Sequence, residues 1–347
     1  MTTVATATVR PPSRRFVVRR RLWLALAAAL ALVLLAAALS LAIGARDIPL
    51  GTVWASFADY DAANPEHMLV RDGRVARTVI GLVAGACLAL AGALAQSVTR
   101  NPLADPGILG INAGAALAVV LGLTVFSVTS FTGQVWLAFA GAAAAALAVL
   151  VIGGHGVASP VRLALAGAAI TAALTAVTSG ILVAEPFALG EFRFWLAGSL
   201  TGRASIPIVP VLGVAASAAV LAFLGVRPLS ALALGDDAAA SLGVRAWRTR
   251  VVVMVAVALL AGIATALAGP IMFIGLAVPH LVRAVAGASL GWLFALSLPM
   301  GAALVLLCDI AGRVLARPGE IPVGVTTSLL GGAALALLAS RLKVVSL

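Results

Sequence analysis

The residue types that most often carry chemistry are few in this chain and lie far apart. The three histidines, His67, His155 and His280, lack the spacing of a metal site. Both cysteines, Cys87 and Cys308, fall inside apolar runs, where a small buried side chain is the expected role. No Ser/His/Asp arrangement stands out either. We therefore predict no catalytic residue, no metal ligand and no enzymatic activity for this chain.

Nucleotide hydrolysis is also excluded by the pattern. A phosphate-binding loop needs glycines followed by Lys-Ser or Lys-Thr. The one lysine, Lys343, is followed by Val344. We expect no cofactor in this chain.

One acid, Asp309, lies inside an apolar run. An ionisable residue at membrane depth is a functional candidate by default. Arg313 follows four residues later, on the same face of a helix, which favours a structural ion pair. Asp309 is also the sole candidate for a proton path, so a proton-driven secondary transporter is the alternative from a different class.

Three arginines, Arg74, Arg77 and Arg313, stand at the ends of apolar runs. Arginine makes directional bonds to carboxylates, which suits capture of an acidic partner. Anchoring at the lipid interface by snorkelling is the alternative role.

Residues 96–110 interrupt the apolar pattern with two prolines and two glycines. Proline removes a backbone donor and disfavours helix before it. The segment also holds Gln96 and Asn101, next to Pro102. Irregular polar backbone at membrane depth is tolerated only against protein or a water-filled cavity. A pathway or gate and an ordinary turn are both open here.

Residues 232–244 form a segment between two apolar runs that contains polar and charged residues. Two acids open a short Ala-rich stretch, as acids do near a helix start, and a glycine ends it. A short surface helix would be a natural docking element, and a solvated connector is the alternative. The candidate residues are Leu234, Gly235, Asp236, Asp237, Leu242 and Gly243.

The elements that must position these residues follow from composition. The chain is 63% hydrophobic and only 10% charged, whereas soluble domains carry about 25% charged residues. Long continuous apolar runs predict helices and not a barrel, which would alternate. We predict an all-α polytopic membrane protein with a basic tail over 1–21 and a permease domain over 22–347. Its ten spans are 22–44, 77–97, 108–126, 133–153, 161–184, 206–225, 250–268, 271–285, 292–312 and 323–341.

Charge distribution predicts the orientation. With the N-terminus inside, most of the 23 basic residues fall on inner segments. Of the 12 acids, only Asp105, Asp236 and Asp237 do so. In the outer segments, basic and acidic residues are equal in number, so their charges cancel. We expect both termini to be cytoplasmic.

Six segments in order along the chain carry a family resemblance. They are residues 74–78, 96–110, 194–200, 234–243, 269–280 and 320–327. Together they resemble the FecCD-type permease family, which includes the vitamin B12, ferric-hydroxamate and ferric-enterobactin importers. Residues 99–107 and 193–200 look most like the ferric-enterobactin branch.

The resemblance implies a type II ABC importer permease in the bacterial inner membrane. It implies a second permease subunit in a homo- or heterodimer, two ATPase subunits that hold ATP and Mg, and an external solute-binding protein. By the same resemblance, residues 234–243 dock the ATPase. Arg74, Arg77 and Arg313 receive acids of the binding protein. The turns at Asn101-Pro102 and Ser159-Pro160 border the inner gate.

The function expected from this resemblance is ferric-siderophore import by alternating access. Vitamin B12 or haem are the rival substrates within the family. No nucleic-acid role is expected, because the +11 charge is explained by membrane orientation.

Overall fold

The computed structural model describes residues 14–44, 46–153, 160–201 and 208–341, and this described part is helical without a strand. The α-helices are α1 Arg14–Ala42, α2 Leu50–Ala58, α3 Pro65–Met68, α4 Val75–Thr99, α5 Ile111–Thr124, α6 Phe131–Gly153, α7 Pro160–Ala184, α8 Pro186–Leu196, α9 Ile208–Leu224, α10 Val226–Leu232, α11 Asp236–Ser241, α12 Ala246–Ala268, α13 Ile274–Ala286, α14 Leu290–Leu315 and α15 Val323–Arg341. A π-helix, η1 Leu69–Arg74, and a 3-10 helix, η2 Pro106–Leu109, complete the order.

Helices occupy all ten predicted spans. Six helices in the described part of the chain are long and apolar enough to cross a membrane, and α9 with α10, bent by 42°, is a seventh if the two form one span. The apolar helices α5 and α13, and the apolar stretch of α15 over residues 323–333, are shorter. The 13 residues of α13 extend about 20 Å, less than the roughly 30 Å of a hydrocarbon core. α1 begins at Arg14, within the predicted tail.

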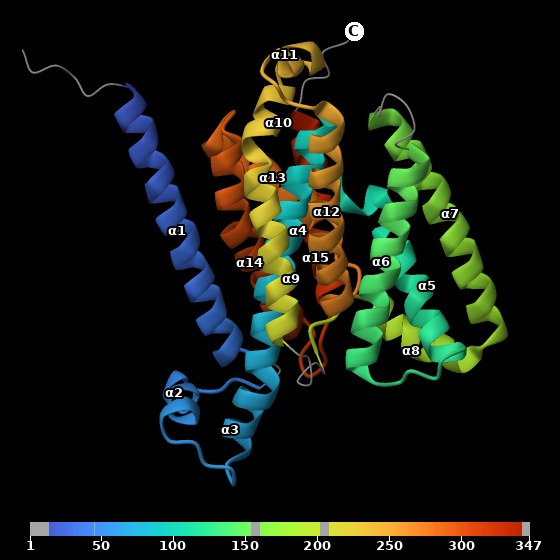
Figure 1. The fold of residues 1–347 in the computed structure, drawn as a ribbon. Helices are drawn as coiled ribbons and strands as arrows, with labels where there is room; N and C mark the ends of the chain where they lie inside the picture. The colour runs from blue at the N-terminus through green and yellow to red at the C-terminus, as the bar shows by residue number, and fades with distance from the viewer. Residues whose placement is uncertain (1–13, 45, 154–159, 202–207, 342–347) are drawn as a thin grey trace, which may run out of the picture.

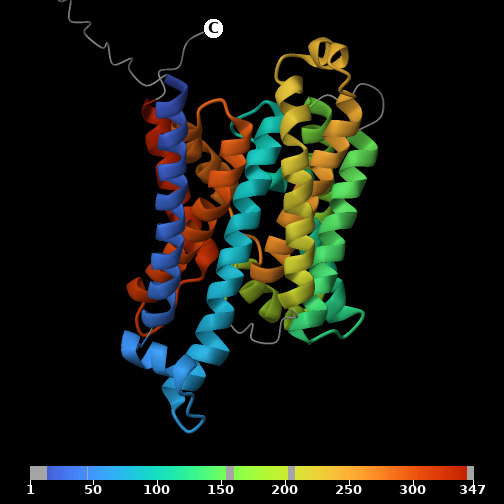
Figure 2. The ribbon, with the colours of Figure 1, turned by 60° about the vertical axis from the view of Figure 1, so that its left-hand side comes forward.

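Helix α4 lies at the centre and packs against α12, α13 and α14 (Figures 1 and 2). Glycines allow this close approach, because a Cβ at Gly92 would overlap the backbone of Gly275, and one at Gly85 would overlap Gly301. Helix α1 lies at the perimeter with few of its side chains buried, and helices α5 to α8 form the opposite flank.

The bundle has two distinct ends. The start of α1, the short α11 and the end of α15 lie together at one end, which we call the α11 end (Figures 1 and 2). Helices α2, α3 and α8 lie at the other, which we call the α2 end. The predicted coupling segment and the predicted docking arginines therefore sit at opposite ends.

Candidate functional site

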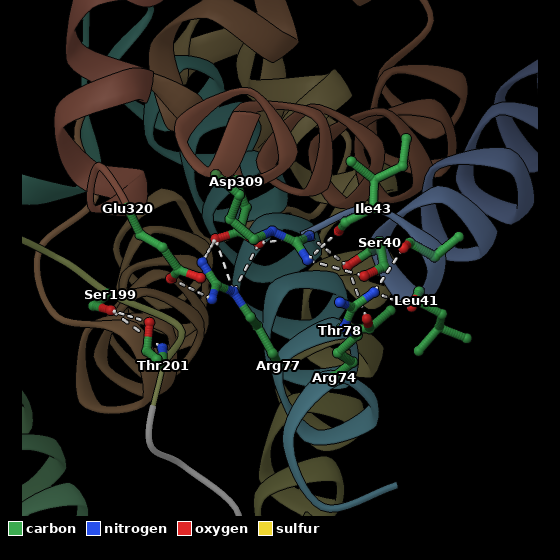
Figure 3. Close-up of polar contacts among 12 residues, drawn as sticks. Ser40, Leu41, Ile43, Arg74, Arg77, Thr78, Ser199, Thr201, Asp309 and Glu320 are labelled. Atoms are coloured by element: carbon green, nitrogen blue, oxygen red, sulfur yellow. Dashed lines mark hydrogen bonds and ion pairs between the residues drawn. The ribbon is translucent and has the colours of Figure 1, made fainter. Parts of the chain in front are cut away.

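At the α2 end, a buried carboxylate lies between two guanidinium groups. Asp309 of α14 is fully buried, and its Oδ1 accepts from Arg77 Nη2 of α4 at 2.8 Å (Figure 3). Its Oδ2 pairs with Arg313 Nη2 at 3.0 Å. Arg77 Nη1 also donates to Glu320 at 2.7 Å. The network joins α4, α14 and the segment before α15, and every charge in it has an opposite partner.

The same network holds the end of α1. The last carbonyls of a helix have no partner within that helix, and here arginines supply the donors. Arg74 Nη1 donates to two of these carbonyls at 2.7 Å, and Arg313 Nη1 donates to the other two at 3.0 and 2.7 Å. The carbonyls belong to Leu41 and Ala42, and to Ser40 and Ile43. Ser40 Oγ and Thr78 Oγ1 share a further bond of 2.9 Å.

The predicted pairing of Asp309 with Arg313 is confirmed. Arg74, Arg77 and Arg313, which we expect to receive acids of a binding protein, are only 6%, 8% and 2% exposed. A fully buried carboxylate and the end of α1 both require donors, and these side chains provide them. A cavity of about 250 Å³, lined by all three arginines and by Glu320, opens beside them. Docking through these arginines stays a prediction.

At the α11 end, the predicted coupling residues form one exposed element. Gly235 and Gly243 flank α11 with φ of 115° and 77°, which disfavours other residues there. Leu234 and Leu242 project into the open on either side of the short helix. Two exposed leucines that flank a short helix make an apolar surface suited to a protein partner.

A second Asp between two arginines anchors this element. Asp236 pairs with Arg100, at the end of α4, at 3.1 Å and with Arg250 of α12 at 2.9 Å. Arg100 also donates to the carbonyl of Leu232. The Asp236 side chain is 44% exposed. The short helix is thus tied to the ends of two central helices, while the adjacent Asp237 is exposed and forms no ion pair with another described residue.

The predicted gate residues fall into two environments. Gln96 is buried; its amide donates to the carbonyls of Gly275 and Leu276 at 3.3 and 3.4 Å. Its oxygen accepts from Arg283 at 2.7 Å. Asn101, by contrast, lies in an exposed turn, where its side chain accepts from Leu103 N at 2.9 Å.

A cavity of about 400 Å³ adjoins this turn. Asn101 and Asp105 line it on one side and Val161 and Leu165, near the start of α7, on the other. Pro102 is exposed in the same turn. Pro160 begins α7, and Ser159 lies outside the described residues. The structure therefore brings the predicted gate turn at Asn101-Pro102 beside α7, the helix that begins at Pro160 of the second predicted gate turn.

Sequence reasoning missed the partners that are remote in the chain. Arg77 pairs with Asp309 across 232 positions, and Arg100 with Asp236 across 136. Arg283 and Gln96 meet across 187. Their charges were visible in the sequence, but spacing gives no signal for contacts between distant helices.

No group of three or more metal-ligating side chains occurs among the residues that the structure describes. Cys87 and Cys308 are buried, free thiols. The fold and its two end networks define a polytopic helical membrane protein whose polar groups join its helices.

Comparison with known proteins shows the family to which this membrane protein belongs. The profile of the FecCD transport family matches residues 32–341, and the chain belongs to this family. It is 44% identical to the ferric enterobactin transport system permease protein FepD of Escherichia coli K12, over 90% of this chain and 93% of that protein. It is 37% identical to the probable siderophore transport system permease protein YfiZ of Bacillus subtilis 168, over 89% and 93%.

A solved structure supports the same fold. A metal-chelate type ABC transporter in an inward-facing conformation matches 91% of this chain and 99% of its own, with a TM-score of 0.77 and 26% identity. The family resemblance of the six sequence segments is thus confirmed.

Proposed function

We propose that this chain is the membrane-spanning subunit of an ATP-driven importer that carries a ferric siderophore across the bacterial cytoplasmic membrane. The observation that carries the proposal is the 44% identity, over nine-tenths of the chain, to a permease named for ferric enterobactin. A permease named for iron(3+)-hydroxamate is 39% identical. The relative named for hemin is 35% identical over 75% of this chain, which favours a siderophore over haem.

The partners in this proposal are a second permease subunit, two ATPase subunits and an extracytoplasmic binding protein. The ATPases would hold ATP and Mg, so that this chain performs no covalent chemistry. The exposed leucines at 234 and 242 support α11 as the surface that an ATPase contacts.

The α11 end would face the cytoplasm, with both chain termini. The excess of arginine over acids in the segments at this end supports that orientation. The α2 end would then face outward, toward the binding protein.

Coupling would run from α11 through Asp236 to the end of α4. Movement of α11 would shift Arg100, which directly precedes the Asn101 turn and its 400 Å³ cavity. The pathway would lie between two permease subunits, because small residues pack the helices of one subunit too closely for a bulky chelate.

Docking of the binding protein at the arginine-lined cavity belongs to the same proposal. A partner carboxylate that entered the cavity would meet Arg74, Arg77 and Arg313, whose guanidinium groups are held in place by Asp309 and the end of α1. Preorganised arginines lose little conformational entropy when they bind an anion.

Transport in proteoliposomes tests the proposal. The chain, with its ATPase and binding protein, should take up radioactive ferric siderophore only when ATP is supplied on the α11 side. A protonophore should leave uptake intact. Uptake that needs a proton gradient and no ATP would instead establish the secondary transporter, and saturable uptake of haem or vitamin B12 alone would correct the substrate.

A further inference from the structure

Helix α2 carries an exposed apolar stripe. Leu50, Trp54 and Phe57 are 63%, 74% and 51% exposed, and their spacing of four and three residues places them on one helical face. An adjoining face is buried: Val53 packs against Ile48 and Val70, and Ser56 is buried beside it. The helix is thus held to the protein by one face, while the next face presents three large apolar groups.

The depth of α2 follows from its contacts with α1. The amide of Ile48 donates to the carbonyl of Ala42, the last residue of α1, at 2.9 Å. Leu41 packs against the small core that holds Val53. The part of α1 that can cross a membrane, Arg19–Ala42, has 24 residues, and its apolar stretch after Arg21 is about 32 Å of helix, against roughly 30 Å of hydrocarbon core. The end of α1 therefore marks a membrane boundary, and α2 begins level with it.

The lateral position of α2 is also at the membrane. Helix α1 lies at the perimeter of the bundle, and α2 lies beside its end (Figures 1 and 2). The exposed leucines of α1, among them Leu30, Leu34 and Leu35, form a lipid-facing surface. Helix α2 lies beside the end of α1, at the boundary where Trp and other aromatic side chains are enriched.

We propose that the Leu50, Trp54 and Phe57 stripe is a membrane anchor that lies in the interface between headgroups and acyl chains at the α2 end. An amphipathic helix of this kind buries its apolar face about 5–10 Å into that boundary. The charged residues remain in water: Arg46 pairs with Glu66, and Arg71 lies 4.4 Å from the ring centre of Tyr60.

A protein partner is the competing occupant of the stripe. The turn between α2 and α3, which bears Asp59 and Asp61, projects farther from the bundle than α2 does (Figure 1). A partner that approaches from outside meets this acidic turn first. The stripe itself lies nearer the bundle and the end of α1, so lipid is the occupant that its position favours.

Fluorescence of Trp54 in bilayers tests the anchor directly. The difference in emission between wild type and Trp54→Phe isolates this indole from the other tryptophans. Brominated lipids, labelled just below the headgroup, should quench most of that difference, and aqueous iodide should quench little. Quenching by iodide and not by bromolipid would overturn the proposal. So would protection that arises only when the binding protein is added.

Cysteine accessibility gives a second measurement that does not need the indole. Leu50→Cys and Phe57→Cys, both on the stripe, should react with a membrane-impermeant maleimide roughly tenfold more slowly in bilayers than Ala62→Cys, because the interface shields them. Ala62 is an exposed control in the α2–α3 turn, and the native thiols are buried. Equal rates at all three sites would exclude the anchor. Neither measurement requires transport, so the anchor can fail while the importer proposal stands.

Discussion

The two ends of the bundle carry the same charge motif in different surroundings. At the α2 end, Asp309 lies between Arg77 and Arg313 with no exposed surface. At the α11 end, Asp236 lies between Arg100 and Arg250 with nearly half of its side chain exposed. The same arrangement of one acid and two arginines can therefore hold helices rigidly where it is buried, or exchange its partners where it is exposed.

Solvent explains the difference. A buried charge that loses its partner costs about 3–5 kcal/mol, because it remains uncompensated away from water. An exposed ion pair contributes only about 0.2–1 kcal/mol, because water and salt replace the partner. The α2 end should therefore hold α1, α4 and α14 together rigidly. The α11 end should change its pairing at low cost, as the proposed coupling to an ATPase would require.

The largest expected effect is at the buried motif. Asp309→Asn should lower the free energy of unfolding by about 3–5 kcal/mol, because the buried Arg313 loses its counter-charge and Arg77 keeps only Glu320. Thermal unfolding of the purified chain measures the loss. Glu320→Gln, at a side chain 32% exposed, is the matched control and should cost less.

The same variant tests the role of the acid in transport. The pH profile of uptake by the Asp309→Asn protein that does fold should match that of wild type. A shifted pH optimum with unchanged stability would show that Asp309 carries protons, and that the buried motif is not a structural joint.

The second effect is at the exposed motif, and it concerns coupling more than stability. Asp236→Asn should reduce stability by less than about 1 kcal/mol while it lowers substrate-stimulated ATPase activity of the assembled transporter. Asp237→Asn is the control, since this exposed neighbour has the same charge and forms no ion pair within the part of the chain that the structure describes. Equal stimulation in both variants would remove Asp236 from the coupling route.

The two ends should also differ in their response to salt, and this comparison needs no mutation. Ionic strength raised from 0.01 to 1 M shortens the screening length from about 30 to about 3 Å for exposed charges. Hydrogen exchange of α11 amides should become faster, and exchange in the last turn of α1 should not change. Equal responses at both ends would contradict the contrast in solvent exposure.

The smallest effect is a pH dependence at the rim of the α2 end. The hydrogen bond from Arg317 lowers the pKa of Asp47 below its ordinary value of 3.8. Because the folded pKa is the lower one, this contribution to stability is present above pH 3.8 and disappears as pH falls through the folded pKa. The difference in stability between wild type and Asp47→Asn should shrink over that acidic window. A difference that is independent of pH would show that the pair contributes nothing.

The sequence by itself determined the class, the helices and the family. Apolar runs specify helices because lipid offers the backbone no hydrogen bonds, so ten helices lie where the runs predicted them. Local signals also located the α11 element between its two glycines and the Asp309–Arg313 pair at four-residue spacing. Each of these depends on neighbours along one helix or one turn.

Only the tertiary structure decided what the arginines do. Arg77 and Arg100 each meet an acid from a distant helix, and Arg74 meets the end of α1. Whether such a charge is buried or exposed depends on which helices pack beside it, and helix packing depends on surfaces that the spacing of a single segment does not encode. The same physics applies to α2: the helical spacing of Leu50, Trp54 and Phe57 is present in the sequence, but only the contact of Ile48 with Ala42 places this helix at the end of α1.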